Sequence, residues 1–163
     1  MWWQRFEPRM QSRAMREASG EELVVTVNGH HLAVGDSGLI ERGVRAALRS
    51  EGVLAGEVSV TLLDDGQIQE LNSSYLGRPH PTDVIAFSLG GDADVLGDVY
   101  IGRDQAARQA SDLGETLETE LLRLAIHGTL HVLGYDHPEG AERIESSMFV
   151  LQERLVSEVL TAN

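Results

Sequence analysis

The sequence predicts a mixed α/β or α+β domain, and three observations support this prediction. Segments of strand character alternate with segments of helical character in the first half of the chain, and helical segments dominate the second half, an order that fits a mixed architecture. The 163 residues suffice to bury about two-thirds of the unfolded surface around one core. The hydrophobic content of 42% is ordinary for a globular protein.

A strand followed by a helix is predicted at the start of the regular region. Leu23–Val27 has the alternation of a strand, and Asn28-Gly29 after it is a turn signal. Ser37 is the candidate N-cap of a helix that ends near Gly52. The predicted buried face of this helix consists of Ile40, Val44, Ala47 and Leu48.

The next two elements are a second strand and a short helix. Val58–Leu63 is apolar and rich in β-branched residues, which favours a strand. Asp64 or Asp65 then caps a helix that reaches Tyr75. The stretch 77–81 contains two prolines, which exclude a regular helix or a central strand there.

Two strands and three helices complete the prediction. Residues 83–89 and 98–101 have strand character, and residues 104–113 form an Ala-rich helix that ends at Gly114. Thr116 opens the strongest helical segment, which Gly134 ends. A last helix is predicted to follow Pro138 and to run to Leu160.

The first 20 residues differ from the rest of the chain. Four arginines against two glutamates give this segment a net charge of +2, which leaves −15 for the remainder of a chain whose total is −13. A basic amphipathic arm is one interpretation; a flexible extension, or a translation start assigned upstream of Met10 or Met15, is the interpretation preferred here. Residues 21–163 are expected to form a single domain.

Composition excludes several chemistries. The chain has no Cys, so thiolate metal sites, disulfides and cysteine nucleophiles are absent. It has no Lys, which removes Schiff-base catalysis and the P-loop lysine. The acidic balance argues against a broad nucleic-acid-coating surface but allows a local basic groove. With no apolar run of transmembrane length and no Sec-type signal, a cytoplasmic location away from membranes is expected.

The segment HGTLHVLGYDH, residues 127–137, carries the strongest chemical signal. His127 and His131 are four residues apart on a predicted helix, so both side chains lie on one face with Cβ atoms about 5–6 Å apart and reach one ion. Gly134 allows the helix to end and the chain to return His137 to the same ion. Three neutral imidazoles leave a fourth position for a zinc-bound water, the layout of a catalytic Zn²⁺ site with one ion per chain.

The same motif leaves alternatives open. It matches the metzincin protease pattern except that the protease's glutamate, a general base, is replaced by Gly128. A metzincin-like metallopeptidase is therefore a rival, disfavoured by this glycine. A structural zinc with Asp136 or His80 as a fourth ligand is a second rival, and ordinary partly buried histidines are the third.

Four segments in order resemble the YbeY family of bacterial endoribonucleases. They are LNSSYLGRPHPTDVIAFSL (71–89), LGDVYI (96–101), HGTLHVLGYDH (127–137) and MFVLQERL (148–155). The resemblance implies a small mixed four-stranded sheet with about five helices and a zincin-like metal-binding helix. It also implies a zinc-dependent, single-strand-specific endoribonuclease that acts in 16S rRNA 3′-end maturation and ribosome quality control. Single-stranded small-subunit rRNA and ribosomal or ribosome-assembly proteins are the implied partners.

Two positions depart from the family pattern. Leu76 stands where some members carry an arginine that is thought to help bind or cleave RNA, and Ser88 stands where proline is common. Arg78, two residues further on, is the candidate catalytic arginine, since a planar guanidinium matches phosphate oxygens. A non-enzymatic ribosome assembly factor with structural zinc is the remaining alternative.

Other side chains are candidates for supporting roles. Tyr75 has the chemistry to stack on a base, His80 to transfer a proton, and Asp98 or Asp136 to orient a histidine or, for Asp136, to cap the last helix. A basic rim around the cleft would consist of Arg78, Arg103, Arg108 and Arg123.

Overall fold

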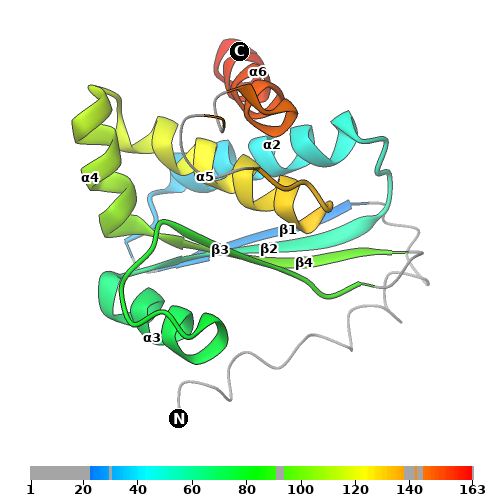
Figure 1. Cartoon of the computed structure of the whole chain (residues 1–163). Helices are drawn as coiled ribbons and strands as arrows, with labels where there is room; N and C mark the ends of the chain where they lie inside the picture. The colour runs from blue at the N-terminus through cyan, green and yellow to red at the C-terminus, as the bar shows by residue number, and fades with distance from the viewer. Residues whose placement is uncertain (1–22, 30, 91–93, 138–141, 143–144, 163) are drawn as a thin grey trace.

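The computed structural model describes residues 23–29, 31–90, 94–137, 142 and 145–162. The predicted flexible extension, residues 1–20, lies outside this part of the chain, as does most of the stretch after Pro138. The described residues form four strands and five helices (Figure 1). In chain order these are β1 (Leu23–Gly29), α2 (Val34–Ser50), β2 (Gly56–Leu63), α3 (Asp65–Leu76), β3 (Val84–Ser88), β4 (Val95–Gly102), α4 (Arg103–Leu113), α5 (Leu117–Val132) and α6 (Ser147–Thr161).

The four strands form one mixed sheet in the order β1-β2-β4-β3. β1 pairs with β2 and β2 pairs with β4 in parallel, whereas β3 pairs with β4 in antiparallel orientation. Parallel neighbours need crossover connections, and α2 supplies the one between β1 and β2. The predicted α/β class with a small mixed four-stranded sheet and about five helices is therefore confirmed.

The helices form unequal layers on the two faces of the sheet. α2 and α5 cover one face and α6 packs outside them, whereas α3 lies on the opposite face (Figure 1). The main core lies between the sheet and the α2–α5 layer, and the four positions predicted for the buried face of α2 are fully buried. None of the described helices has the length and apolar character needed to cross a membrane.

α5 approaches the sheet closely because glycines line the contact. A Cβ atom on Gly128 would lie 2.4 Å from Val99 Cγ1, and one on Gly97 would lie 2.4 Å from Val132 Cγ1. Neither position has room for a side chain. The helix that carries the histidine motif is thus seated directly on β4, with eleven of its residues buried.

Most of the predicted helix ends are confirmed by their capping interactions. The Asp64 side chain accepts a hydrogen bond from Gln67 N in a complete capping box, and Thr116 accepts one from Thr119 N. Gly114 ends α4 in the left-handed conformation at φ 67°. These caps satisfy backbone groups that a helix end would otherwise leave unpaired.

Several predicted boundaries are wrong. Asn28-Gly29 is not a turn but the end of β1, because parallel pairing with Thr61 and Leu62 extends the strand. Ser37 lies inside α2, which begins three residues earlier.

The last helix begins at Ser147 rather than soon after Pro138. Its N-cap is Ser146, whose side chain accepts a hydrogen bond from Phe149 N. This hydroxyl cap, rather than the proline, therefore sets the observed start. Asp136, proposed from the sequence as a cap for this helix, does not cap it.

Replacing Gly128 with alanine tests the close helix–sheet contact. We expect Gly128→Ala to lower the free energy of unfolding by about 1–3 kcal/mol, because the added methyl group collides with Val99. Gly38→Ala, in α2, is the matched control, since its Cβ would meet only Arg42 Nη1 at 3.7 Å. Urea unfolding followed by circular dichroism measures both, and equal stability of the two variants would contradict the packing described here.

Candidate metal centre

The histidine motif occupies the last two turns of α5 and the segment that follows. His127 and His131 lie one turn apart on the helix, and Gly134, at φ 95°, lets the chain reverse after it. The reversal brings His137 back to the other two, as predicted. The ring centroids of His127 and His131 lie 4.6 Å apart, and that of His137 lies 5.1 and 5.2 Å from them.

The nitrogen atoms of the three rings converge on one point. Each histidine offers one ring nitrogen, and these three atoms lie within 4.8 Å of one another. The Nε2 atoms of His127 and His131 are 3.0 Å apart. Two imidazole nitrogens bound to one tetrahedral zinc would lie about 3.3 Å apart, given Zn–N bonds of about 2.0–2.1 Å. The cluster therefore has the chemistry and the spacing to hold a metal ion.

Two of the rings are held by hydrogen bonds at their outer nitrogens. His127 Nδ1 lies 2.7 Å from Gln152 Oε1, and His131 Nδ1 lies 2.9 Å from the carbonyl oxygen of Tyr135. An oxygen acceptor at Nδ1 keeps the proton there and leaves the Nε2 lone pair for a cation. The 3.0 Å contact between the two Nε2 atoms is a hydrogen bond when one of them carries a proton; with both protons at Nδ1, both Nε2 lone pairs are available to a shared cation.

A pocket of about 440 Å³ adjoins His127 between α4, α5 and α6. Its polar wall is mainly acidic, with five carboxylates and the single guanidinium of Arg123. Its charged lining residues are Asp83, Asp112, Glu115, Glu120, Arg123 and Glu153.

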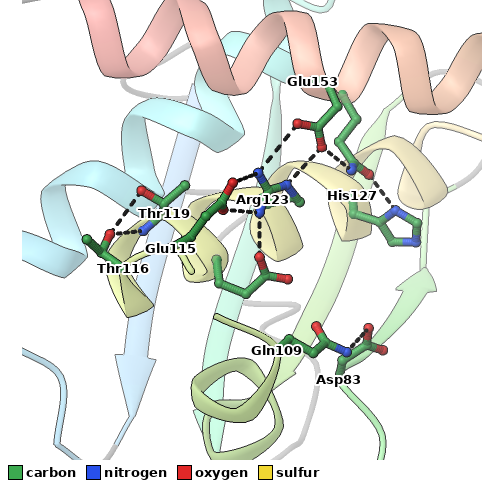
Figure 2. A network of polar contacts seen from close by, with 10 residues as sticks. Asp83, Gln109, Glu115, Thr116, Thr119, Arg123, His127 and Glu153 are labelled. Atoms are coloured by element: carbon green, nitrogen blue, oxygen red, sulfur yellow. Dashed lines mark hydrogen bonds and ion pairs between the residues drawn. The ribbon is translucent and has the colours of Figure 1, made fainter. Parts of the chain in front are cut away.

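Arg123 is surrounded by carboxylates from three places in the chain (Figure 2). It pairs with Glu115 at 2.7 Å and with Glu153 at 2.8 Å, and also with Glu120 one turn before it. Burial alone would lower the pKa of Arg123, but the hydrogen bonds that Arg123 donates to Glu115 and Glu153 outweigh this effect and raise the pKa. Burial raises the pKa of Glu120, an effect that Arg123 partly offsets. Arg123 therefore stays protonated, and the three glutamates around it balance its positive charge.

Two of the four arginines predicted to form a basic rim, Arg108 and Arg123, are already paired with carboxylates. Arg108 donates two hydrogen bonds, of 2.9 and 2.8 Å, to the carboxylate of Asp65. Arg103 starts α4 with a buried Nε, for which the described residues offer no hydrogen-bond partner. Arg78 and Arg108 are both exposed, and Arg78 lies in the connection between α3 and β3.

The remaining sequence candidates lie in different surroundings. Tyr75 is 55% exposed and packs edge-to-face on Phe87. His80 is exposed, in the same connection as Arg78. Side chains alternate along a strand, and since Val99 faces α5, Asp98 points to the other face of the sheet, where it accepts a hydrogen bond from Tyr100. Asp98 is therefore not a partner of the histidines.

A structural zinc with a fourth protein ligand finds little support. Among the described residues, the group able to hold a metal comprises His127, His131 and His137 alone. Asp136 instead accepts a hydrogen bond from the backbone N–H of His137, which helps to shape the turn.

Gln152 and Glu153 belong to the segment 148–155 that carries the family resemblance, but their role at this site was not predicted from the sequence. Gln152 is 2% exposed on the inward face of α6, and its neighbour Glu153 accepts hydrogen bonds from both Gln152 and Arg123. The available signal was a glutamine among apolar positions, four residues after Met148 and three before Leu155. A polar side chain on a buried helix face requires a partner, and that partner is His127.

The fold and the cluster together define a class of protein. It is an α/β protein with a zincin-like helix, on which two histidines one turn apart and a third from the following turn form a group able to hold a metal. Within this class the chain belongs to the Endoribonuclease YbeY family, whose sequence model matches residues 35–160.

Individual relatives agree with this membership. The chain is 46% identical to Endoribonuclease YbeY of Aquifex aeolicus over 106 residues, which cover 63% of this chain and 71% of the relative. It is 43% identical to that of Moorella thermoacetica over 136 residues, covering 75% and 78% of the two chains. The solution structure of TM1509 from Thermotoga maritima is similar at a TM-score of 0.62 and 31% identity, covering 83% of this chain and 89% of that one.

Removing one imidazole tests the metal centre. We expect His131→Ala to reduce bound zinc from about one equivalent per chain to a small fraction, because two imidazoles alone form a weak site. The fold should persist, since the neighbouring apolar residues of α5 remain buried in the core. Elemental analysis after gel filtration, together with thermal melting, measures both quantities.

His31→Asn is the matched control for this variant. His31 is exposed at φ 58°, a conformation that asparagine also adopts, so metal content should not change. If His131→Ala unfolded the protein at room temperature, the site would be structural rather than an open centre of a folded domain.

Proposed function

We propose that this protein is a zinc-dependent endoribonuclease that cuts single-stranded RNA at the centre formed by His127, His131 and His137. The observation that carries the proposal is the converging set of three ring nitrogens, of which two are fixed by acceptors at Nδ1. Relatives named Endoribonuclease YbeY support the reaction class.

The three imidazoles have a defined part in this chemistry. They are neutral ligands, so they would leave the charge of a bound ion available to a phosphodiester. When bound, zinc at such a site acts as a Lewis acid toward phosphate and lowers the pKa of a coordinated water, the zinc-bound water expected from the sequence. Gln152 and Tyr135 hold two of the rings, and Arg78 is proposed to stabilise charge that develops on the phosphate.

The surroundings of position 128 disfavour the rival metallopeptidase. A protease of this pattern needs a glutamate there as general base. In this chain the Cβ direction of Gly128 runs into Val99 and Val84, at 2.4 and 3.2 Å, so a carboxylate has no path to the metal centre. The site therefore suits a reaction that does not use that base.

The wider biological role follows the same line. We propose that the substrate is small-subunit rRNA near its 3′ end, in maturation and quality control in the cytoplasm, with ribosomal or assembly proteins as partners. With a net charge of −13 the chain has weak electrostatic attraction for RNA, and a partner would supply the missing contacts. We further propose that residues 21–163 form one hydrolase domain, since the family match spans most of them.

Substrate class separates the two enzymatic readings. We expect zinc-loaded protein to cut an unstructured RNA oligonucleotide and to leave casein intact. Chelation should abolish cleavage and added zinc should restore it. The His137→Ala variant should be inactive while remaining folded. Raising the salt concentration should reduce RNA binding steeply, because phosphate contacts release counterions. If the wild-type protein hydrolysed casein and His137→Ala did not, the result would support the metallopeptidase instead.

Arginine substitutions test the proposed role of Arg78. We expect Arg78→Ala to lower kcat by about 10²-fold, the size of effect seen when one charge-stabilising donor is removed. Arg78→Lys should recover only part of this rate, since an ammonium lacks the planar fork of a guanidinium. Arg42→Ala, an exposed arginine on α2, is the control. An Arg78→Ala rate equal to the control would exclude Arg78 from the reaction.

A further inference from the structure

A continuous chain of polar contacts runs from the acidic pocket to His127 (Figure 2). Arg123 donates from Nε to Glu153 Oε1 at 2.8 Å, and Gln152 Nε2 donates to the same oxygen at 3.0 Å. The other end of the Gln152 amide, Oε1, lies 2.7 Å from His127 Nδ1. This series of hydrogen bonds connects two helices, since Arg123 and His127 belong to α5, and Gln152 and Glu153 belong to α6.

The order of donors and acceptors along this series of hydrogen bonds allows only one orientation of the Gln152 amide and one tautomer of His127. An ionised carboxylate only accepts hydrogen bonds, so Glu153 fixes the NH₂ end of Gln152 toward itself. The amide oxygen of Gln152 must then point at His127, whose Nδ1 must carry the proton. A reversed amide would set its oxygen against Glu153 and its NH₂ against Nδ1, which would move the proton of His127 to Nε2. That tautomer has no lone pair at Nε2 to offer a metal.

The remaining contacts explain why Glu153 is held in place. Its second oxygen lies 3.5 Å from Arg123 Nη2, so the guanidinium faces both carboxylate oxygens. Arg123 is itself fixed by Glu115 and Glu120, and only 15% of its side chain is exposed. Gln152 is almost completely buried and His127 is 6% exposed, so water does not readily replace these bonds.

We propose that Arg123, Glu153 and Gln152 form a positioning chain that selects the Nδ1-protonated tautomer of His127 and so sets the metal affinity of the centre. None of the three is assigned contact with the substrate. Their action passes through His127 alone. The inference rests on the proposed metal centre, but its first consequence, the tautomer, exists in the metal-free protein and is measured there.

The tautomer is the first readout. In the metal-free full chain, at a pH where imidazoles are neutral, long-range ¹H–¹⁵N NMR spectra should show His127 protonated at Nδ1. Gln152→Leu removes the acceptor, and the Nε2-protonated form of His127 should then appear. Glu153→Gln, which keeps the shape of the side chain, should produce a smaller shift in the same direction. An unchanged tautomer in both folded variants would overturn the proposal.

Metal affinity is the second readout. We expect Gln152→Leu to weaken zinc binding by roughly 10–100-fold in competition with a chelator, the usual effect of removing the partner of a metal-binding histidine. The visible spectrum of bound Co²⁺ should change in the same variant. Glu158→Gln, an exposed acid on the same helix, is the control for Glu153→Gln and should leave affinity unchanged. Affinity equal to wild type in both Gln152→Leu and Glu153→Gln would also overturn the proposal.

These readouts separate two kinds of failure. If the wild-type protein binds no zinc while the tautomer of His127 still depends on Gln152, the proposed function fails. The control of the His127 tautomer by Arg123, Glu153 and Gln152 is then still supported. If zinc binds tightly in wild type and in every folded variant, the metal centre stands and the positioning chain fails. If Gln152→Leu does not fold, the milder Glu153→Gln decides.

Discussion

The direct contact between α5 and β4 is the constraint on which the rest of the structure depends. Gly128 and Gly97 remove the side chains that would otherwise separate the helix from the strand. With α5 seated this deeply, β3, β4, α2, α4 and α6 all pack against it. This packing on several sides positions His127 and His131, the two histidines that α5 carries, and a metal centre needs ligands held within a fraction of an ångström. Gly128 thus explains two features at once: it replaces the glutamate of the protease pattern, and it allows the close packing of α5 on β4.

Deep burial creates a second requirement, since α5 carries polar side chains at buried positions. Glu120, His127 and Thr129 are all buried, and each has a different kind of hydrogen-bonding or ion-pair partner. Thr129 bonds back to the carbonyl of Ala125, Glu120 pairs with Arg123, and His127 bonds to Gln152. An unpaired buried polar group costs about 1–3 kcal/mol, so these partners are needed for stability as well as for the site. The hydrogen bonds that connect Arg123 to His127 in Figure 2 therefore satisfy buried polar groups and also hold a ring of the proposed metal centre.

The sequence predicted those features that local patterns encode. Capping residues such as Asp64 and Thr116, the spacing of His127 and His131, and the turn at Gly134 are all visible within a few positions of one another, and the structure has all of them. Features that depend on distant partners were missed. The end of β1 is set by pairing with a strand about 30 residues away, and Arg123 is neutralised partly by Glu153, 30 positions further along.

The charge distribution decides how an RNA chain would approach the proposed centre. On the side of the pocket, five carboxylates outnumber a single arginine, which is already paired with three of them, so a phosphate group would meet repulsion there. Neutral imidazole ligands would leave the charge of a bound ion uncompensated, so the positive potential near them would come from that ion. Charges beyond about 10 Å are screened at ordinary ionic strength, so this local contrast matters more than the net charge of the whole chain. With an ion bound, an anionic substrate would be attracted at the histidines and repelled from the neighbouring pocket, which would favour placing one phosphodiester at the histidines over binding the RNA broadly.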